Sequence, residues 1–138
     1  MMTLSITSTV TAILALLMFP LTLQISLRRA ALGKAEGDFF AFVFGDGNDA
    51  VLRRRIRAFG NFIEYAPFCI LLLAFIEIAS APNAILYTTA SLLLGGRVIH
   101  AAGMLLDISP LRGLAMLMTY ITLLLPSIWL LLNINAGG

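Results

Sequence analysis

RRRIRAFGNFIEYAP, residues 53–67, joins a cluster of arginines to the start of a long apolar run. It carries Arg57, Asn61 and Glu64 into a region whose composition is otherwise typical of a membrane span. In a helix these positions, i, i+4 and i+7, lie on one face. Ionisable groups inside a span cost roughly 2.5–3.5 kcal/mol each, so they normally face a bundle interior or a wet cavity. We therefore expect the function of the protein to depend on this face.

The composition of the chain indicates a membrane protein. Its 138 residues are 60% hydrophobic and 12% charged, and the mean hydropathy is +0.99. Soluble domains are about 45–50% apolar and about 25% charged. The length suits a single membrane domain over residues 1–138 with about four spans. The net charge of +2 comes from basic loops, which indicates an orientation in the membrane and no nucleic-acid partner. The one cysteine, Cys69, excludes a disulfide framework and a thiolate metal site.

Four apolar segments predict an all-α, four-helix transmembrane bundle. The first segment lacks the positive start and small-residue cleavage site of a signal peptide, so we interpret it as a span. The turn at 81–83 is too short for anything but two antiparallel helices on either side. Glu77 lies near the opposite membrane surface from Glu64, and we interpret it as an interfacial or packing carboxylate. The predicted spans are about 6–27, 57–80, 84–106 and 113–133.

Residues 28–56 form the one long polar stretch. Within it, FFAFVF at 39–44 places four phenylalanines before a Gly-Asp-Gly turn, which is consistent with a short interfacial segment. The following DGND lacks the closing glutamate of an EF-hand and is interpreted as a turn. No Lys or Arg lies in the N-terminal segment, the 81–83 turn or the tail. This asymmetry predicts periplasmic termini, with the loops at 28–56 and 107–112 in the cytoplasm.

Arg97 in the third span and Glu64 in the second are predicted to lie at a similar depth, roughly 15 Å below the cytoplasmic surface. We expect them to share one cavity. A plain Arg97–Glu64 ion pair that locks the bundle is the alternative, but Arg57 and Asn61 would then be polar neighbours without partners. His100, at i+3 from Arg97, is expected to line the same wall. No second histidine or carboxylate pair accompanies it, so a metal site is not expected.

The motif Arg57-x-x-x-Asn61-x-x-Glu64-Tyr65-x-Pro67 resembles the signature of the MAPEG family, the membrane-associated proteins in eicosanoid and glutathione metabolism. The resemblance covers essentially the whole chain in length and span count. Two further motifs resemble the prostaglandin E synthase and microsomal glutathione transferase branch. They are Arg97-x-x-His100 in the third span and Pro110-x-Arg112 before the fourth.

The resemblance implies a homotrimer that binds glutathione between subunits in the cytoplasmic half. It also implies a transferase or peroxidase that acts on lipophilic electrophiles from the bilayer. Planar arginine forks and a carboxylate suit the two carboxylates and one ammonium of glutathione. With one residue deleted in the preceding loop, Arg112 matches the family arginine that faces the thiol, which makes it the predicted catalytic residue. The residues implied to bind glutathione are Arg57, Asn61, Glu64, Tyr65, Arg97 and His100.

Three positions depart from the family pattern. Several relatives carry a tyrosine where this chain has Met104. Some carry an arginine where it has Gly60, and basic residues, contributed by the neighbouring subunit, near the position of Ser26. The family also contains members that bind ligands without turning them over. A non-catalytic membrane protein that binds a lipid or glutathione therefore stays as the alternative function. The short chain resembles a bacterial member, which implies the inner membrane.

Overall fold

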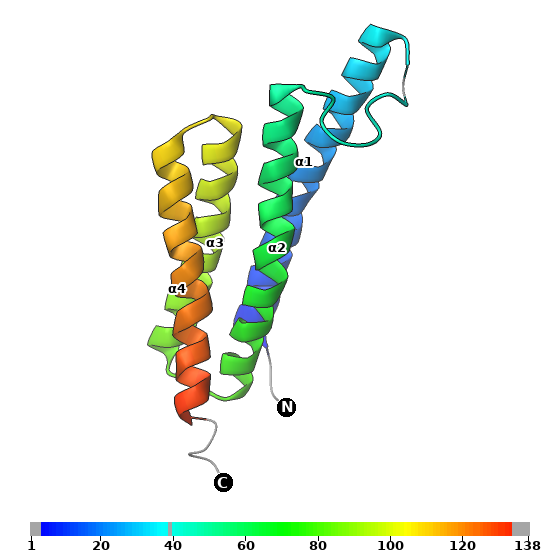
Figure 1. Ribbon diagram of the computed structural model, residues 1–138. Coiled ribbons are helices and arrows are strands. Elements are labelled where there is room, and N and C mark those ends of the chain that lie inside the picture. The colour runs from blue at the N-terminus through cyan, green and yellow to red at the C-terminus, as the bar shows by residue number, and fades with distance from the viewer. Residues whose placement is uncertain (1–3, 39, 134–138) are drawn as a thin grey trace.

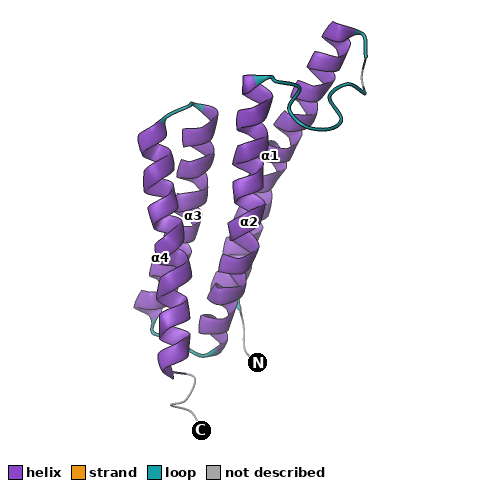
Figure 2. Cartoon of the chain, viewed as in Figure 1, coloured by secondary structure: helices purple, strands orange, loops and turns teal. Residues whose placement is uncertain are grey.

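The computed structural model describes residues 4–38 and 40–133 as four helices joined by short connections (Figures 1 and 2). Each helix is long and apolar enough to cross a membrane, which confirms the predicted all-α architecture with four spans. The helices are α1 (Ser5–Glu36), α2 (Ala50–Ile78), α3 (Asn83–Leu105) and α4 (Ser109–Asn133).

The first two helices extend beyond the predicted spans. With 32 residues, α1 continues nine residues past the predicted end at 27. It ends where Gly37 adopts the left-handed conformation that commonly closes helices. The second helix begins at Ala50, seven residues before the predicted start, because Asp49 caps it by accepting a hydrogen bond from the Leu52 amide at 2.6 Å. Hydropathy detects only the apolar part of a helix, so these polar ends escape it.

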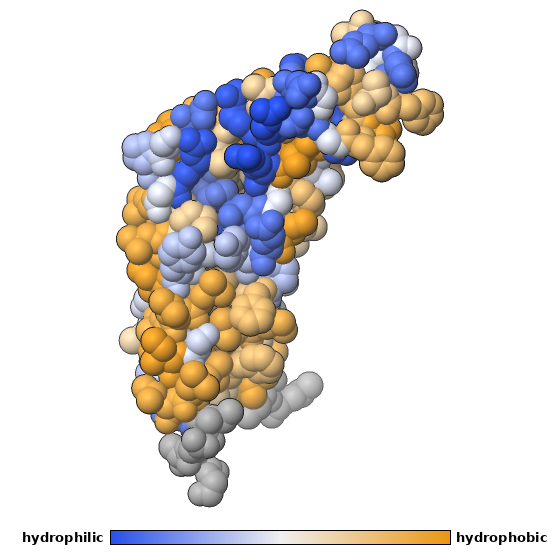
Figure 3. Space-filling view, viewed as in Figure 1, coloured by the Kyte–Doolittle hydropathy of each residue, from blue (hydrophilic) through white to orange (hydrophobic). Residues whose placement is uncertain are grey.

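The helices run alternately up and down, so both described chain ends lie at one end of the bundle (Figure 1). The 37–49 connection and the α3–α4 turn lie at the other, which we call the charged end. Most of the hydrophilic surface gathers there, whereas the remainder of the visible face is largely apolar (Figure 3). Many large apolar side chains point outward, among them Phe19, Phe68 and Leu131. Such a surface suits lipid and would be unusual on a soluble monomer.

Glu77 joins α2 to the beginning of α1. Its carboxylate accepts hydrogen bonds from the Ile6 amide at 2.9 Å, the Thr7 amide at 2.8 Å and the Thr7 hydroxyl at 2.6 Å. The first amides of a helix have no partner within the helix, and lipid offers none. Glu77 therefore caps α1 from a neighbouring helix, which confirms the interpretation of it as a packing carboxylate.

Ion pairs join neighbouring helices at the charged end. Arg28 of α1 binds Asp49 through two hydrogen bonds, at 2.7 and 3.2 Å. These bonds, together with the Leu52 amide, lower the pKa of Asp49 from 3.8 to about 2. Asp107, in the α3–α4 turn, accepts hydrogen bonds from Arg54 of α2 at 3.1 Å and from Arg112 of α4 at 3.2 Å. The turn is thus attached to both neighbouring helices.

Candidate functional site

A polar groove of about 430 Å³ opens between α2 and α3 in the half of the bundle nearer the charged end. Four of the predicted site residues meet there: Arg57, Asn61, Glu64 and His100. Arg57 and Glu64 are exposed, Asn61 is partly buried and His100 is buried. The helical spacing in α2 brings its three members to one wall, as predicted. The other residues that line the groove are Ile56, Gly60 and Met104.

Arg97 lies inside the protomer, with only 1% of its surface exposed. One terminal nitrogen donates to the Asn61 backbone carbonyl at 3.1 Å and to the Asn61 side-chain oxygen at 2.8 Å. The other donates to the hydroxyl of Thr119 in α4. The guanidinium also lies 5.7 Å from the ring centre of Tyr65, within the range of a cation–π contact. Arg97 therefore fixes Asn61 from behind the groove and connects α2, α3 and α4.

The expectation that Arg97 and Glu64 share one cavity is wrong for the protomer. Glu64 lines the groove and Arg97 does not, and none of the ion pairs among residues 4–38 and 40–133 joins them. The reason is rotation about the helix axis. The count of residues from a membrane surface predicts depth but not direction, and Asn61 and Tyr65, not Glu64, are the α2 residues turned toward Arg97.

Tyr65 and Arg112 lie outside the lining of the groove. Tyr65 is partly buried and contacts Arg97 through its ring. Arg112, in the first turn of α4, donates to Asp107 at 3.2 Å and to the Ser109 hydroxyl at 2.6 Å. It also packs on Gly103 of α3, where an added Cβ would lie 3.2 Å from the Arg112 side chain.

Sequence reasoning missed Thr119 and did not recognise the role of Gly60. Thr119 is 2% exposed, accepts from Arg97 and donates to the Ala115 carbonyl at 2.8 Å. The only sequence feature that marks Thr119 is a hydroxyl side chain inside a span. Such residues are too common in membrane helices for this feature to identify one of them. Gly60 was noted only as a departure from a family pattern. In the structure nothing lies within 4 Å of a Cβ built there, so the missing side chain leaves the groove open.

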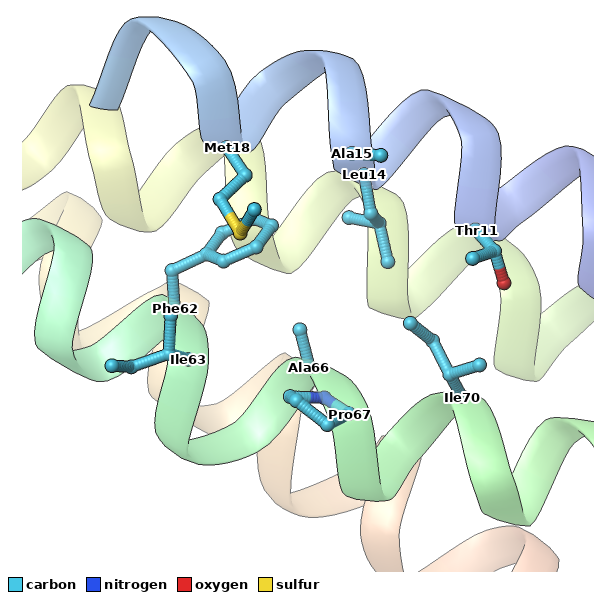
Figure 4. A pocket seen from close by; sticks show the side chains of 9 residues that line it. All are labelled: Thr11, Leu14, Ala15, Met18, Phe62, Ile63, Ala66, Pro67 and Ile70. Atoms are coloured by element: carbon cyan, nitrogen blue, oxygen red, sulfur yellow. The ribbon is translucent and has the colours of Figure 1, made fainter. Parts of the chain in front are cut away.

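A second hollow, the apolar recess, lies between α1 and α2. Its volume is about 160 Å³, and Figure 4 shows its side chains converging from the two helices. Met18 and Phe62 close one end, while Thr11 brings the only hydroxyl among the labelled side chains. Ile63 and Pro67 of the recess neighbour Gly60 and Glu64 of the polar groove along α2. A polar and an apolar hollow thus adjoin along one helix.

A guanidinium, a carboxamide, a carboxylate and an imidazole together can bind a small molecule that carries both signs of charge. Residues 7–132 of the chain match the sequence model of the MAPEG family. This chain belongs to the MAPEG family. The match covers all four helices, so the MAPEG bundle is the whole described structure apart from its outermost residues.

The curated relatives that this MAPEG chain resembles include Inner membrane protein YecN of Escherichia coli strain K12. The two chains are 34% identical over 64 residues, which are 46% of this chain and 49% of YecN. YecN of Escherichia coli O6:H1 matches with the same identity and coverage. The chain thus spans about half the length of the curated relatives it matches. No solved structure matches it.

Proposed function

We propose that this MAPEG protein binds glutathione in the polar groove and transfers its thiolate to a lipophilic electrophile, or reduces a lipophilic peroxide with it. The observation that carries the proposal is the groove itself, where Arg57, Asn61, Glu64 and His100 meet within a membrane helix pair. Arg57 supplies a planar fork for a glutathione carboxylate, and Glu64 supplies a counter-charge for the ammonium. Asn61 and His100 add neutral hydrogen-bonding groups.

Arg97 and Tyr65 support this site from behind. Both oxygens of Asn61 accept from Arg97, and its side-chain amide donates to the sulfur of Met116 in α4 at 3.5 Å, so the second N–H of that amide remains to face a ligand. The Tyr65 ring covers the guanidinium. In this proposal Arg97 and Tyr65 contribute to glutathione binding by positioning Asn61.

Arg112 is proposed to favour the thiolate. A free thiol has a pKa of about 8.5 and is mostly protonated at neutral pH, yet the thiolate is the nucleophile. Lowering that pKa by about two units requires about 2.7 kcal/mol of preferential stabilisation of the anion, within the range of one well-placed charge. The Arg112 side chain is 31% exposed, so a ligand can reach it, and its contacts with Asp107 and Ser109 hold it at the charged end.

The proposed assembly is a homotrimer with glutathione between subunits. Arg57 and Glu64 are exposed on the protomer although they belong to a span, and charges facing lipid are costly. A neighbouring copy would cover the groove and complete its outer wall. The apolar recess beside the groove suits the lipophilic substrate, which would enter from the bilayer.

The proposed location is the bacterial inner membrane, which the printed name of YecN supports. The basic residues of the charged end favour the cytoplasm, with both termini in the periplasm.

One observation favours the alternative of a non-catalytic member that binds a lipid or glutathione. Arg112 already pairs with Asp107 and does not line the groove, so a thiol bound there would have to compete with a carboxylate for it.

Detergent-purified protein tests the proposal through two readouts. Calorimetry measures glutathione binding, and conjugation of glutathione to an aromatic electrophile measures catalysis. We expect both in the parent protein. Arg112→Leu should abolish conjugation and the thiolate absorbance of bound glutathione while leaving affinity nearly unchanged. Unchanged turnover in that variant removes Arg112 from the mechanism, and binding without turnover in the parent favours the non-catalytic alternative.

A further inference from the structure

The segment 40–47 between α1 and α2, which we call the aromatic arm, exposes apolar side chains at the charged end of the bundle. Phe40 is 83% exposed and Phe44 is 87% exposed, with Val43 at 42% between them. Phe42, by contrast, is only 5% exposed. In Figure 3 a cluster of apolar surface stands out at the side of the upper right projection, next to hydrophilic surface. Two phenyl rings facing outward on a connection are unfavourable in water.

The arm is tied down on both sides by polar contacts. Arg29 of α1 donates to the Gly45 carbonyl at 3.4 Å, and Asp46 forms an ion pair with Arg53 of α2. Gly47 has a φ of +56°, and a Cβ there would collide with the Phe42 ring. The arm therefore holds its polar groups against the protein and turns Phe40 and Phe44 outward. This is the opposite of the arrangement that a water-exposed loop adopts.

The position of the arm relative to the spans indicates which surroundings it meets. At about 1.5 Å per residue, α1 is roughly 48 Å long, whereas the hydrocarbon core of a bilayer is about 30 Å thick. The end of α1 at the charged end leans away from the other helices, and the arm folds back toward the start of α2 (Figure 1). The arm thus lies beside the start of α2, level with the hydrophilic surface of the charged end, where the chain meets the headgroups of the bilayer.

We propose that the aromatic arm inserts Phe40 and Phe44 into the boundary between headgroups and acyl chains of the bilayer that the helices span. Apolar and aromatic side chains enter this boundary in interfacial segments, and neighbouring cations contact anionic headgroups. Arg29, whose guanidinium donates to the Gly45 carbonyl, supplies such a cation beside the arm. The arm then fixes the tilt of α1 and holds the end of α1 that extends beyond the hydrocarbon core close to the membrane surface.

Tryptophan fluorescence of the full chain in phosphatidylcholine–phosphatidylglycerol vesicles tests this. Trp129 is the only tryptophan, so Trp129→Phe provides a silent background for Phe44→Trp. Spin-labelled lipids carry the quencher either near the carbonyl end or near the methyl end of the acyl chain, and iodide quenches from water. We expect the shallow lipid quencher to act at least about twofold more strongly than the deep one, and iodide to act weakly.

Two control positions calibrate the depth. Phe68→Trp, on the exposed face of α2 within the span, should be quenched mainly by the deep lipid label. Lys34→Trp, at the exposed end of α1, should be quenched by iodide. If position 44 behaves like position 34, the arm is in water and the proposal is wrong. If all three quenchers fail, the ring is covered by a second copy of the chain, which also overturns it. Phe40→Trp serves as a second probe if Phe44→Trp does not fold.

Discussion

At the residue scale, Asn61 lies between the polar groove and the buried Arg97. Its side chain borders the polar groove, and both of its oxygens accept hydrogen bonds from the buried Arg97. Glu64, one turn further along α2, is exposed and makes no ion pair within the part of the chain that the structure describes. A ligand that replaces water in the groove thus meets a fixed amide and an available carboxylate.

Glu64→Gln should weaken glutathione binding by at least about tenfold, because the neutral amide no longer attracts the ammonium group. The free energy of unfolding should stay within about 0.5 kcal/mol of the parent value, because the substitution changes an exposed side chain that forms no ion pair. Calorimetry and thermal unfolding on the same preparation measure both quantities. A loss of about 3–5 kcal/mol in stability would instead mean that Glu64 neutralises a buried cation.

Gly60→Leu should block the groove without disturbing the fold. Nothing lies within 4 Å of a Cβ at Gly60, so a leucine extends into the groove that ligand would occupy. Glutathione binding should be lost while helix content and melting temperature are retained. Gly113→Leu is the matched control, because that helical glycine has equally open surroundings and lies outside the groove. Full binding by Gly60→Leu would place the ligand elsewhere.

At the scale of the elements, α1 depends on its neighbours at both ends. Glu77 of α2 caps its start, and Arg28 near its other end binds Asp49, the N-cap of α2. Each contact joins residues at least 21 positions apart. The α1–α2 pair is thus held at both of its ends by polar contacts, with apolar packing between them.

Glu77→Leu should lower the stability of the detergent-solubilised protein by at least about 2 kcal/mol. Two backbone amides lose their acceptor, and each buried orphan costs about 1–3 kcal/mol. Thr7→Val is the milder comparison, because it removes only the hydroxyl hydrogen bond to Glu77. Thermal unfolding followed by circular dichroism should rank the parent above Thr7→Val and Thr7→Val above Glu77→Leu. Equal melting of all three would show that the cap is dispensable.

The Arg28–Asp49 pair should make the charged end sensitive to acid. The pKa of Asp49 is lowered from 3.8 to about 2, chiefly by the hydrogen bonds from Arg28. A lowered folded-state pKa stabilises the fold above the ordinary value, and this contribution is lost as pH falls from 3.8 toward 2.

Asp49→Asn isolates that contribution, because its amide oxygen can still cap α2 but carries no charge. Unfolding measured against pH should show the parent losing its advantage over the variant within this acid range. If the two proteins differ by a constant free energy of unfolding from pH 3.8 down to about 2, the ion pair has no role in stability.

At the scale of the whole molecule, the protomer places charge on its outer face within a span. Arg57 and Glu64 are exposed there, while Phe68 and Phe75 continue outward along the same helix. A neighbouring copy would cover these charges, and in the proposed homotrimer native mass spectrometry from mild detergent should report three copies per particle. Glutathione should bind to that species and not to dissociated protomers. Stoichiometric binding by single copies would show that the groove is complete without a neighbour.

Much of the architecture follows from local patterns in the chain. Apolar runs of span length predict four helices, the distribution of arginines predicts a charged end, and helical spacing predicts that Arg57, Asn61 and Glu64 share a wall. These properties are local because each depends on residues within one helix or one loop. The groove of α2 could therefore be predicted in outline, including the contribution of His100 from α3.

The partners of Arg97 depend on packing between helices. Depth in the membrane follows from counting residues, but the rotation of each helix is set by side chains far apart in the chain. That rotation directs Arg97 toward Asn61 and Thr119 and leaves Glu64 facing the open groove. The capping of α1 by Glu77 depends in the same way on a residue 70 positions away. Interhelical hydrogen bonds of this kind have no local signature, so they appear only when the four helices are assembled.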